Sequence, residues 1–113
     1  MIFYFKNKKL ETEEKEAKGI WRVFGLMFKT KNTKNLLFNF PRRTKMAIHS
    51  FFVFFPFLAV WLDEKNEIIE MKIVAPFTPH IKPSKKYNKL IELPLNNKNK
   101  KILEILVGKE TFK

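Results

Sequence analysis

Cysteine is missing from this 113-residue sequence, and glycine is nearly missing. Without Cys the chain cannot build a disulfide framework, a thiol nucleophile or a thiolate metal site. Glycine stands only at positions 19, 25 and 108, so neither a phosphate-binding loop nor a dinucleotide-binding glycine pattern is possible. The sequence therefore excludes nucleotide binding of the usual kinds, and it predicts no cofactor.

The side chains that usually carry catalysis or bind metals are also few. With two His, two Ser and one Asp, a nucleophile, a base and an orienting acid are difficult to assemble. Neither His49 nor His80 has a His-x-x-His partner or a pair of carboxylates beside it. His49 and Ser50 are adjacent, but neighbours on a strand point to opposite faces. The sequence predicts no catalytic residue and no metal site, and it does not favour an enzyme.

One long apolar run, residues 46–62, raises the question of a membrane span. Its seventeen residues fall short of the roughly twenty that a span needs, and they include His49, Ser50 and a central Pro56. Its Phe and Val content favours extended structure instead. We therefore expect two core strands that meet at Pro56 rather than an integral membrane protein. Because no signal peptide is visible and Cys is absent, we expect a cytoplasmic protein.

The apolar content is high enough for a folded protein. Hydrophobic residues make up 45% of the chain and aromatic residues 15%, including thirteen Phe, so apolar burial can offset the loss of chain entropy. A chain of this length has one core, and we expect a single domain over residues 1–113.

Alternating and apolar segments bounded by turn residues predict a mainly β protein. In the segment 87–93, Lys89 and Glu92 are expected to be exposed. Pro41 and Pro94 are expected to end the strands that precede them. The spacing of residues 57–62 and 67–74 predicts a hairpin whose loop is 63–66. The expected strands are 2–5, 36–40, 57–62, 67–74 and 87–93.

Two further segments have helical spacing of apolar residues. These are residues 20–28 around Gly25 and residues 102–106, where Gly108 marks the helix end. Residues 10–18 contain strong helix formers, but they have almost no apolar stripe to bury. Propensity alone predicts a helix there, and packing gives it no support.

Several motifs occur in the order and spacing of a known family. They are Gly-Leu-Met-Phe at 25–28, Leu-Leu-Phe-Asn-Phe at 36–40, and Pro56 ahead of Val-Trp-Leu-Asp at 60–63 and Glu-Ile-Ile-Glu at 67–70. From about Trp21 to Leu95 the chain resembles the domain of unknown function 192 family. The resemblance implies a compact antiparallel β-barrel or sandwich with one or two short helices, and no established activity. It also implies that residues 10–16 pair as a strand and that a helix starts near Ala17, and we follow it there.

The chain departs from this family around Pro56. Many relatives carry Lys-Asn-Thr before the proline and Pro-Leu-Asp afterwards. Here the corresponding residues are Phe-Phe-Val at 51–53 and Pro-Phe-Leu at 56–58. These polar positions are apolar in this chain, so no family site is carried over to it.

The charge is the one functional signal, because 23 basic and 11 acidic residues give a net charge of +12. Residues 22–45 hold seven basic side chains and no acidic one, and residues 81–113 hold nine against three. If these segments share a face, they would attract nucleic acid or another polyanion. The candidate binding residues are Arg22, Arg42, Arg43, Lys45 and His49.

The sequence thus predicts a binding module that contacts an anion or polyanion through this basic surface. One alternative is a nonspecific nucleic-acid binding protein, another is a hydrolase-like enzyme using His49, and a third is a merely solvated, Lys-rich surface. Lys outnumbers Arg twenty to three, and Lys is less suited to planar recognition of phosphates and bases. A base-stacking platform would need exposed aromatic side chains, and an exposed Phe patch would indicate a partner interface.

Overall fold

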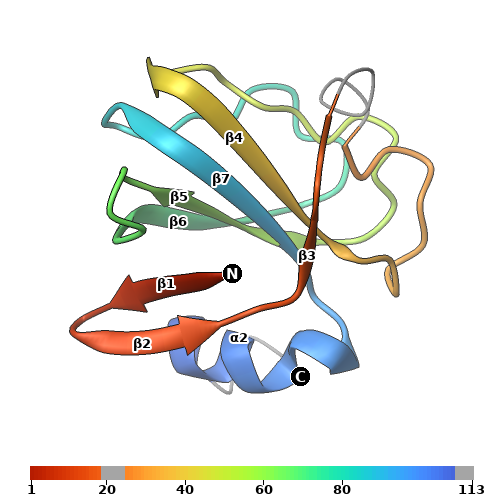
Figure 1. Ribbon diagram of the computed structural model, residues 1–113. Coiled ribbons are helices and arrows are strands. Elements are labelled where there is room, and N and C mark those ends of the chain that lie inside the picture. Colours follow the sequence, from red (N-terminus) through yellow and green to blue (C-terminus); the bar gives the residue numbers. More distant parts are fainter. Residues whose placement is uncertain (19–24, 109–113) are drawn as a thin grey trace.

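A five-stranded sheet with the order β3-β4-β7-β5-β6 organises the molecule (Figure 1). This computed structural model describes residues 1–18 and 25–108. Neighbouring strands of the sheet are antiparallel except β3 and β4, and β1 and β2 form a separate antiparallel hairpin. The elements are β1 (Ile2–Phe5), β2 (Lys8–Glu11), β3 (Glu14–Glu16), β4 (Asn35–Thr44), β5 (Phe57–Leu62), β6 (Ile68–Val74), β7 (Tyr87–Pro94), the 3₁₀ turn η1 (Asn97–Asn99) and α2 (Lys100–Val107).

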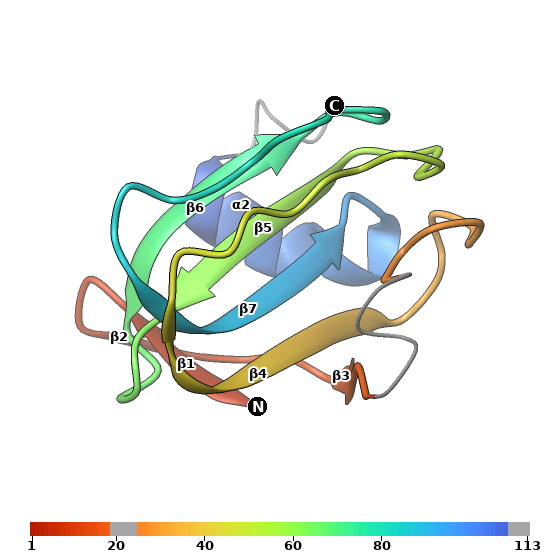
Figure 2. The ribbon, with the colours of Figure 1, turned by 90° about the horizontal axis from the view of Figure 1, so that it is seen from above.

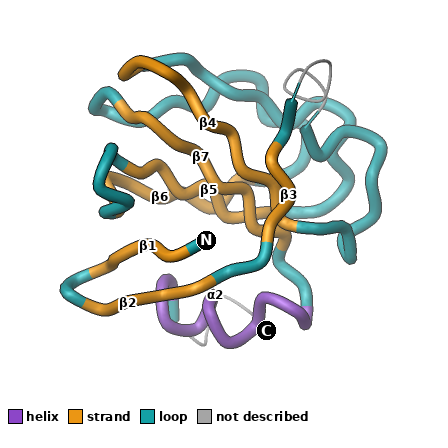
Figure 3. Tube along the Cα trace, viewed as in Figure 1, coloured by secondary structure: helices purple, strands orange, loops and turns teal. Residues whose placement is uncertain are grey.

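Both faces of the sheet are covered, and each cover holds one hydrophobic cluster. The β1–β2 hairpin and α2 cover one face with Phe3, Leu10, Leu103 and Leu106 (Figures 1 and 3). Loops cover the other face, and they contribute buried side chains such as Val53. All six residues of β5 are buried because this strand lies between β6 and β7 under both covers.

The predicted mainly β class is confirmed, and the architecture resembles a sandwich. Strands β3 and β6 stand at the two ends of the sheet order, and the described strands do not close into a barrel. The described part of the chain contains one short α-helix, which ends at Gly108 as predicted. No described helix is long and apolar enough to cross a membrane.

The family resemblance, and not helix propensity, predicted the N-terminal segment correctly. Residues 10–16 lie in strands β2 and β3 and in their connection. Leu10 turns inward to the hairpin cluster, while most of its neighbours stay exposed, so a helix would have had no face to bury. Most of the helix predicted at residues 20–28 falls at residues 19–24, which lie outside the described residues. Residues 25–28 form turns.

The prediction of a core strand before Pro56 is wrong. Residues 49–55 are loop and turn, and β5 begins only after this proline. Long-range hydrogen bonds hold the segment in this irregular path, because the backbone of Ser50 bonds to Phe77 and Thr78 rather than to a neighbouring strand. The phenylalanines at 51, 52 and 54 are consequently exposed.

Pro41 does not end its strand, since β4 continues to Thr44. The pairing of β4 with β7 is irregular between Asn39 and Thr44, which is where a residue without an N–H can be accommodated. On the other side β3 pairs with Asn35, Leu36 and Leu37, so no described strand pairs with β4 there at Pro41.

The predicted β5–β6 hairpin is confirmed, and its turn residues explain it. The carboxylate of Asp63 accepts hydrogen bonds from the backbone N–H groups of Lys65 and Glu67, at 2.8 and 2.9 Å. Asn66 takes a left-handed φ of 64°. A bulge follows, because Trp61 pairs with Glu70 while Leu62 pairs with Ile68. Ile69 therefore packs against the cluster on the loop side, whereas Ile68 and Met71 pack against the hairpin cluster.

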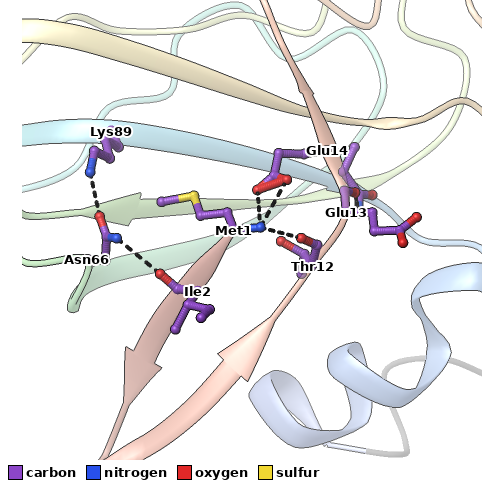
Figure 4. A network of polar contacts seen from close by, with 8 residues as sticks. Met1, Ile2, Thr12, Glu13, Glu14, Asn66 and Lys89 are labelled. Carbon is purple, nitrogen blue, oxygen red and sulfur yellow. Dashed lines mark hydrogen bonds and ion pairs between the residues drawn. The ribbon is translucent and has the colours of Figure 1, made fainter.

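Asn66 also joins the β1–β2 hairpin to the sheet (Figure 4). Its side-chain N–H donates to the carbonyl of Ile2 at 3.0 Å, and its carbonyl oxygen accepts from Lys89 Nζ at 2.6 Å. Its backbone carbonyl accepts from the N–H of Tyr4 at 2.8 Å. One residue with a left-handed backbone thus connects β1, the hairpin turn and β7.

We expect Asn66→Ala to lower the free energy of unfolding by about 2 kcal/mol, because it removes two side-chain hydrogen bonds and leaves a left-handed Ala. Asn66→Gly removes the same bonds without the backbone strain, so its loss should be about 1 kcal/mol smaller. Urea unfolding of both variants measures the difference. Equal loss in the two variants would contradict the role assigned to the backbone.

Candidate functional site

Four large apolar side chains are exposed at one end of the molecule. The exposed fractions are 66% for Phe28, 48% for Phe52, 60% for Phe54 and 48% for Phe77. These residues come from three loops that are distant in sequence. We call them the phenylalanine surface.

The rings of the phenylalanine surface form a continuous row. Phe28 and Phe52 are stacked with 5.2 Å between ring centroids. Phe77 contacts Phe52 and Phe54 edge to face, at centroid distances of 6.1 and 5.5 Å. The contact geometries are those that aromatic pairs prefer, and they hold the four side chains together while leaving each about half exposed or more.

Three of these phenylalanines have a left-handed backbone. The φ angles are 61° for Phe28, 60° for Phe52 and 58° for Phe77. A bulky residue in this region is strained by about 1–3 kcal/mol, and such strain collects at functional sites when the surroundings enforce it. Here a hydrogen bond of 2.9 Å from the Phe28 N–H to the Phe52 carbonyl is one of the enforcing contacts.

Ser50 fixes the loops beneath this row of rings. It is fully buried, and its hydroxyl donates to the carbonyl of Ala75 at 2.6 Å and accepts from the Thr78 N–H at 2.6 Å. Its carbonyl accepts from the N–H groups of Val53 and Phe77, at 3.1 and 2.9 Å. One serine therefore joins the loop that carries two of the rings to the loop that carries Phe77.

The loops of the phenylalanine surface contain no acidic residue. Residues 17–62 and 71–91 hold neither Asp nor Glu. Figure 2 shows the loops that follow β4 and β6 lying over the sheet, on the face opposite α2. An anionic partner would therefore meet no carboxylate in the loops that carry these rings.

The sequence-predicted basic residues lie elsewhere. Arg42 and Arg43 are exposed near the end of β4, and Lys45 is exposed just after it. Ten residues of strand span about 30 Å. In both ribbon views, the loop before β4 and the turn before β5, which carry three of the four rings, lie at the end of the sheet where β4 starts (Figures 1 and 2). We call Arg42, Arg43 and Lys45 the basic end; Arg22 is outside the described residues.

His49 and Ser50 are not brought together as a nucleophile and base. The Ser50 hydroxyl is committed to Ala75, whereas His49 is exposed and its Nδ1 accepts a hydrogen bond from the Phe51 N–H at 3.3 Å. The His49 ring also packs against Phe51 at 5.3 Å. The described residues contain no group of three or more side chains that could hold a metal ion.

A carboxyl group is buried on the loop side of the sheet, contrary to the prediction that it would be exposed. Glu92 lies on β7, the central strand, and is 5% exposed. Its Oε1 lies close to Gly25, where a Cβ atom would be 3.5 Å away. Gly25 has a left-handed φ of 52°, which a residue without a side chain adopts easily. Burial raises the pKa of Glu92 to about 8. Burial likewise raises the pKa of Tyr87, on the same strand, to about 12.

Sequence reasoning missed the phenylalanine surface because it assigned the whole Phe-rich run to the core. Left-handed phenylalanines have no sequence signature of the kind that glycine provides. Their clustering depends on Ser50 and on its hydrogen bonds to Ala75 and Thr78, which lie 25 and 28 residues away in one loop.

Comparison with known proteins identifies a family and two similar structures. A family model described as DUF192, Uncharacterized ACR, matches residues 4–110. A protein of unknown function from Novosphingobium aromaticivorans DSM 12444 has a TM-score of 0.73 at 9% identity, covering 89% of this chain and 75% of that one. A protein from Sinorhizobium meliloti 1021 described as a "putative transcription regulator" has a TM-score of 0.74 at 14% identity, covering 89% and 81%.

These similarities establish the fold and no activity. At identities of 9% and 14% a structural likeness shows the arrangement of the chain alone. No curated protein matches the sequence. The chemistry of the site must therefore be argued from its own residues.

Glu92→Gln should remove the pH dependence that the buried carboxyl imposes. The folded pKa of about 8 lies above the ordinary 4.5, so the unfolded chain loses this proton first and stability falls as pH rises from about 4.5 to about 8. The loss is about 1.4 kcal/mol per pH unit within that window. Denaturation at pH 5 and pH 8 should show the variant gaining about 3 kcal/mol over the parent between the two. The exposed-residue control Glu64→Gln should show no such gain, and an equal gain would contradict this assignment.

Proposed function

The chain belongs to the domain of unknown function 192 family, and from that premise we propose that it is a binding module that holds single-stranded nucleic acid on the phenylalanine surface. The exposed row of four rings carries this proposal. The proposal retains the polyanion partner that the sequence predicted, and it assigns the contact with the bases to these rings instead of to the basic residues. The predictions of a single domain and a cytoplasmic location accompany the proposal.

Base stacking explains why phenylalanines would be exposed and fixed. Unpaired bases stack on aromatic side chains, which contribute about 1–3 kcal/mol per base with little dependence on sequence. Phe28 and Phe54 are at the two ends of the ring row and are the most exposed of the four, so they are the rings best placed to receive bases. Strained backbones held by Ser50 keep this platform formed before a ligand arrives, which reduces the entropic cost of binding.

The charge distribution suits the sugar–phosphate backbone of such a ligand. Lys31 is exposed in the loop that follows Phe28, and no acidic residue lies in any loop of the phenylalanine surface. The basic end is connected to the ring row by residues 46–50, which a pair of hydrogen bonds between Ile48 and Ile81 fixes at 2.7 and 2.8 Å. A strand stacked on the rings and running toward Arg43 would have cations at both ends of its path.

Single strands should bind more tightly than duplexes, in which the bases are not free to stack. Fluorescence anisotropy with a labelled oligothymidylate and the matching duplex, at several salt concentrations, measures this preference. Phe28→Ala and Phe54→Ala should each weaken single-strand binding about tenfold without changing the salt slope. Arg42→Ala/Arg43→Ala should instead reduce the slope, by about 0.7 for each phosphate that the variant no longer neutralises.

A matched control is Tyr4→Ala, because Tyr4 is an exposed aromatic residue on β1, away from the three loops that carry the rings. It should bind like the parent protein, and thermal unfolding of every variant establishes that the fold is kept. Binding to anionic phosphatidylserine vesicles without binding to oligothymidylate would contradict the proposal and identify the exposed rings as a membrane contact. Equal loss in Tyr4→Ala would contradict it as well.

A further inference from the structure

A concave site lies on the side of the sheet opposite the phenylalanine surface, between the β1–β2 hairpin and α2. It is a cleft of about 650 Å³, within the range of small-molecule sites. One wall is the stretch from Lys9 to Glu14, which covers most of β2 and the start of β3 (Figure 4). The other wall is the start of β4 with η1 and α2. We call it the hairpin–helix cleft.

Buried asparagines hold the second wall of the cleft in place. Asn99 donates from its side-chain nitrogen to Asn35 Oδ1 and to the Pro94 carbonyl, both at 2.8 Å. Asn35 in turn donates to the carbonyl of Glu13 at 2.9 Å, which links the two walls. Asn96 Oδ1 accepts from the Asn99 N–H at 3.0 Å. The cleft is therefore a fixed feature of the fold.

The two walls differ in charge. The hairpin wall presents the exposed Glu11 and Glu13 together with Lys9, and the facing wall presents only cations, Lys34, Lys98 and Lys101. No salt bridge joins these walls among the described residues, and Glu14, which also lines the cleft, pairs with the Met1 amino group. The charges of the cleft are thus separated by its width and available to a ligand.

Thr12 also lines the cleft, and it has a buried hydroxyl without a partner in the described part of the chain. Thr12 is 7% exposed, and its Oγ1 has no hydrogen-bond partner among the described residues. A buried polar atom left unpaired is costly, so a ligand group that bonds to it would gain affinity. Leu10, Ile102 and Ile105 add apolar surface to the same cleft.

We propose that the hairpin–helix cleft binds a short zwitterionic peptide. Its ammonium group lies toward Glu11 and Glu13, and its carboxylate lies toward Lys98 and Lys101. Apolar side chains between these two ends pack on the isoleucines of α2, and a polar backbone group bonds to Thr12 Oγ1. The site uses no residue of the phenylalanine surface, so it stands independently of nucleic-acid binding.

Isothermal titration calorimetry with trileucine tests the proposal, because this tripeptide has both charged ends and apolar side chains. The peptide with free termini should bind, and N-acetylated, C-amidated trileucine should bind at least about tenfold more weakly. The double variants Glu11→Gln/Glu13→Gln and Lys98→Ala/Lys101→Ala should each lose about tenfold in affinity. Lys100→Ala is the matched control, since Lys100 is exposed on α2 but does not line the cleft, and it should bind like the parent.

Thr12→Val separates binding from structure. Removing an unpaired buried hydroxyl should leave the melting temperature unchanged or higher, while the affinity for trileucine should fall severalfold. Should Thr12→Val not fold, the surface variants at Glu11 and Glu13 still decide the question. No binding of trileucine, equal binding of the blocked peptide, or an equal loss in Lys100→Ala would each overturn the proposal.

Discussion

The burial of β5 and of most of β7 on both faces is the constraint on which the rest of this structure depends. A strand in the middle of a sheet with two apolar faces is stable only if each face is covered. Here the hairpin and α2 supply regular structure for one face, and loops supply the other. Loops have fewer backbone partners of their own, so side-chain anchors must fix them. Ser50 has that part, and the phenylalanines that do not fit beneath the loops lie exposed above them.

The regular elements were predictable where the signal is local. The Asp63 and Asn66 turn, the apolar run of β5 and the helix ended by Gly108 each depend on residues within a few positions of one another. The path of residues 46–55 was not predictable, because its hydrogen bonds reach the distant loop that contains Ala75 and Thr78. The continuation of β4 through Pro41 was not predictable either, since it depends on which described strands pair with β4 there, and the strand order decides that.

The candidate sites were predictable only in their chemistry. Net charge predicted a polyanion partner, but it could not indicate that Arg42 and Arg43 lie near the far end of β4 from the exposed rings. Alternation along β7 assigned Glu92 to a wet face, and that face does not exist because loops cover it. The hairpin–helix cleft has no motif at all, since its two walls come from opposite ends of the chain.

The uneven placement of acidic residues gives the molecule an electric dipole moment. Most described carboxylates lie in β2, β3, the β5–β6 hairpin and α2, whereas the long stretches that form the opposite cover hold none. In the field of a polyanion such a protein experiences a torque as well as an attraction, so it turns its acid-free loops toward the partner before any contact forms. This orientation acts over about 8 Å at physiological ionic strength. Added salt therefore slows productive encounter even where the final contacts are apolar.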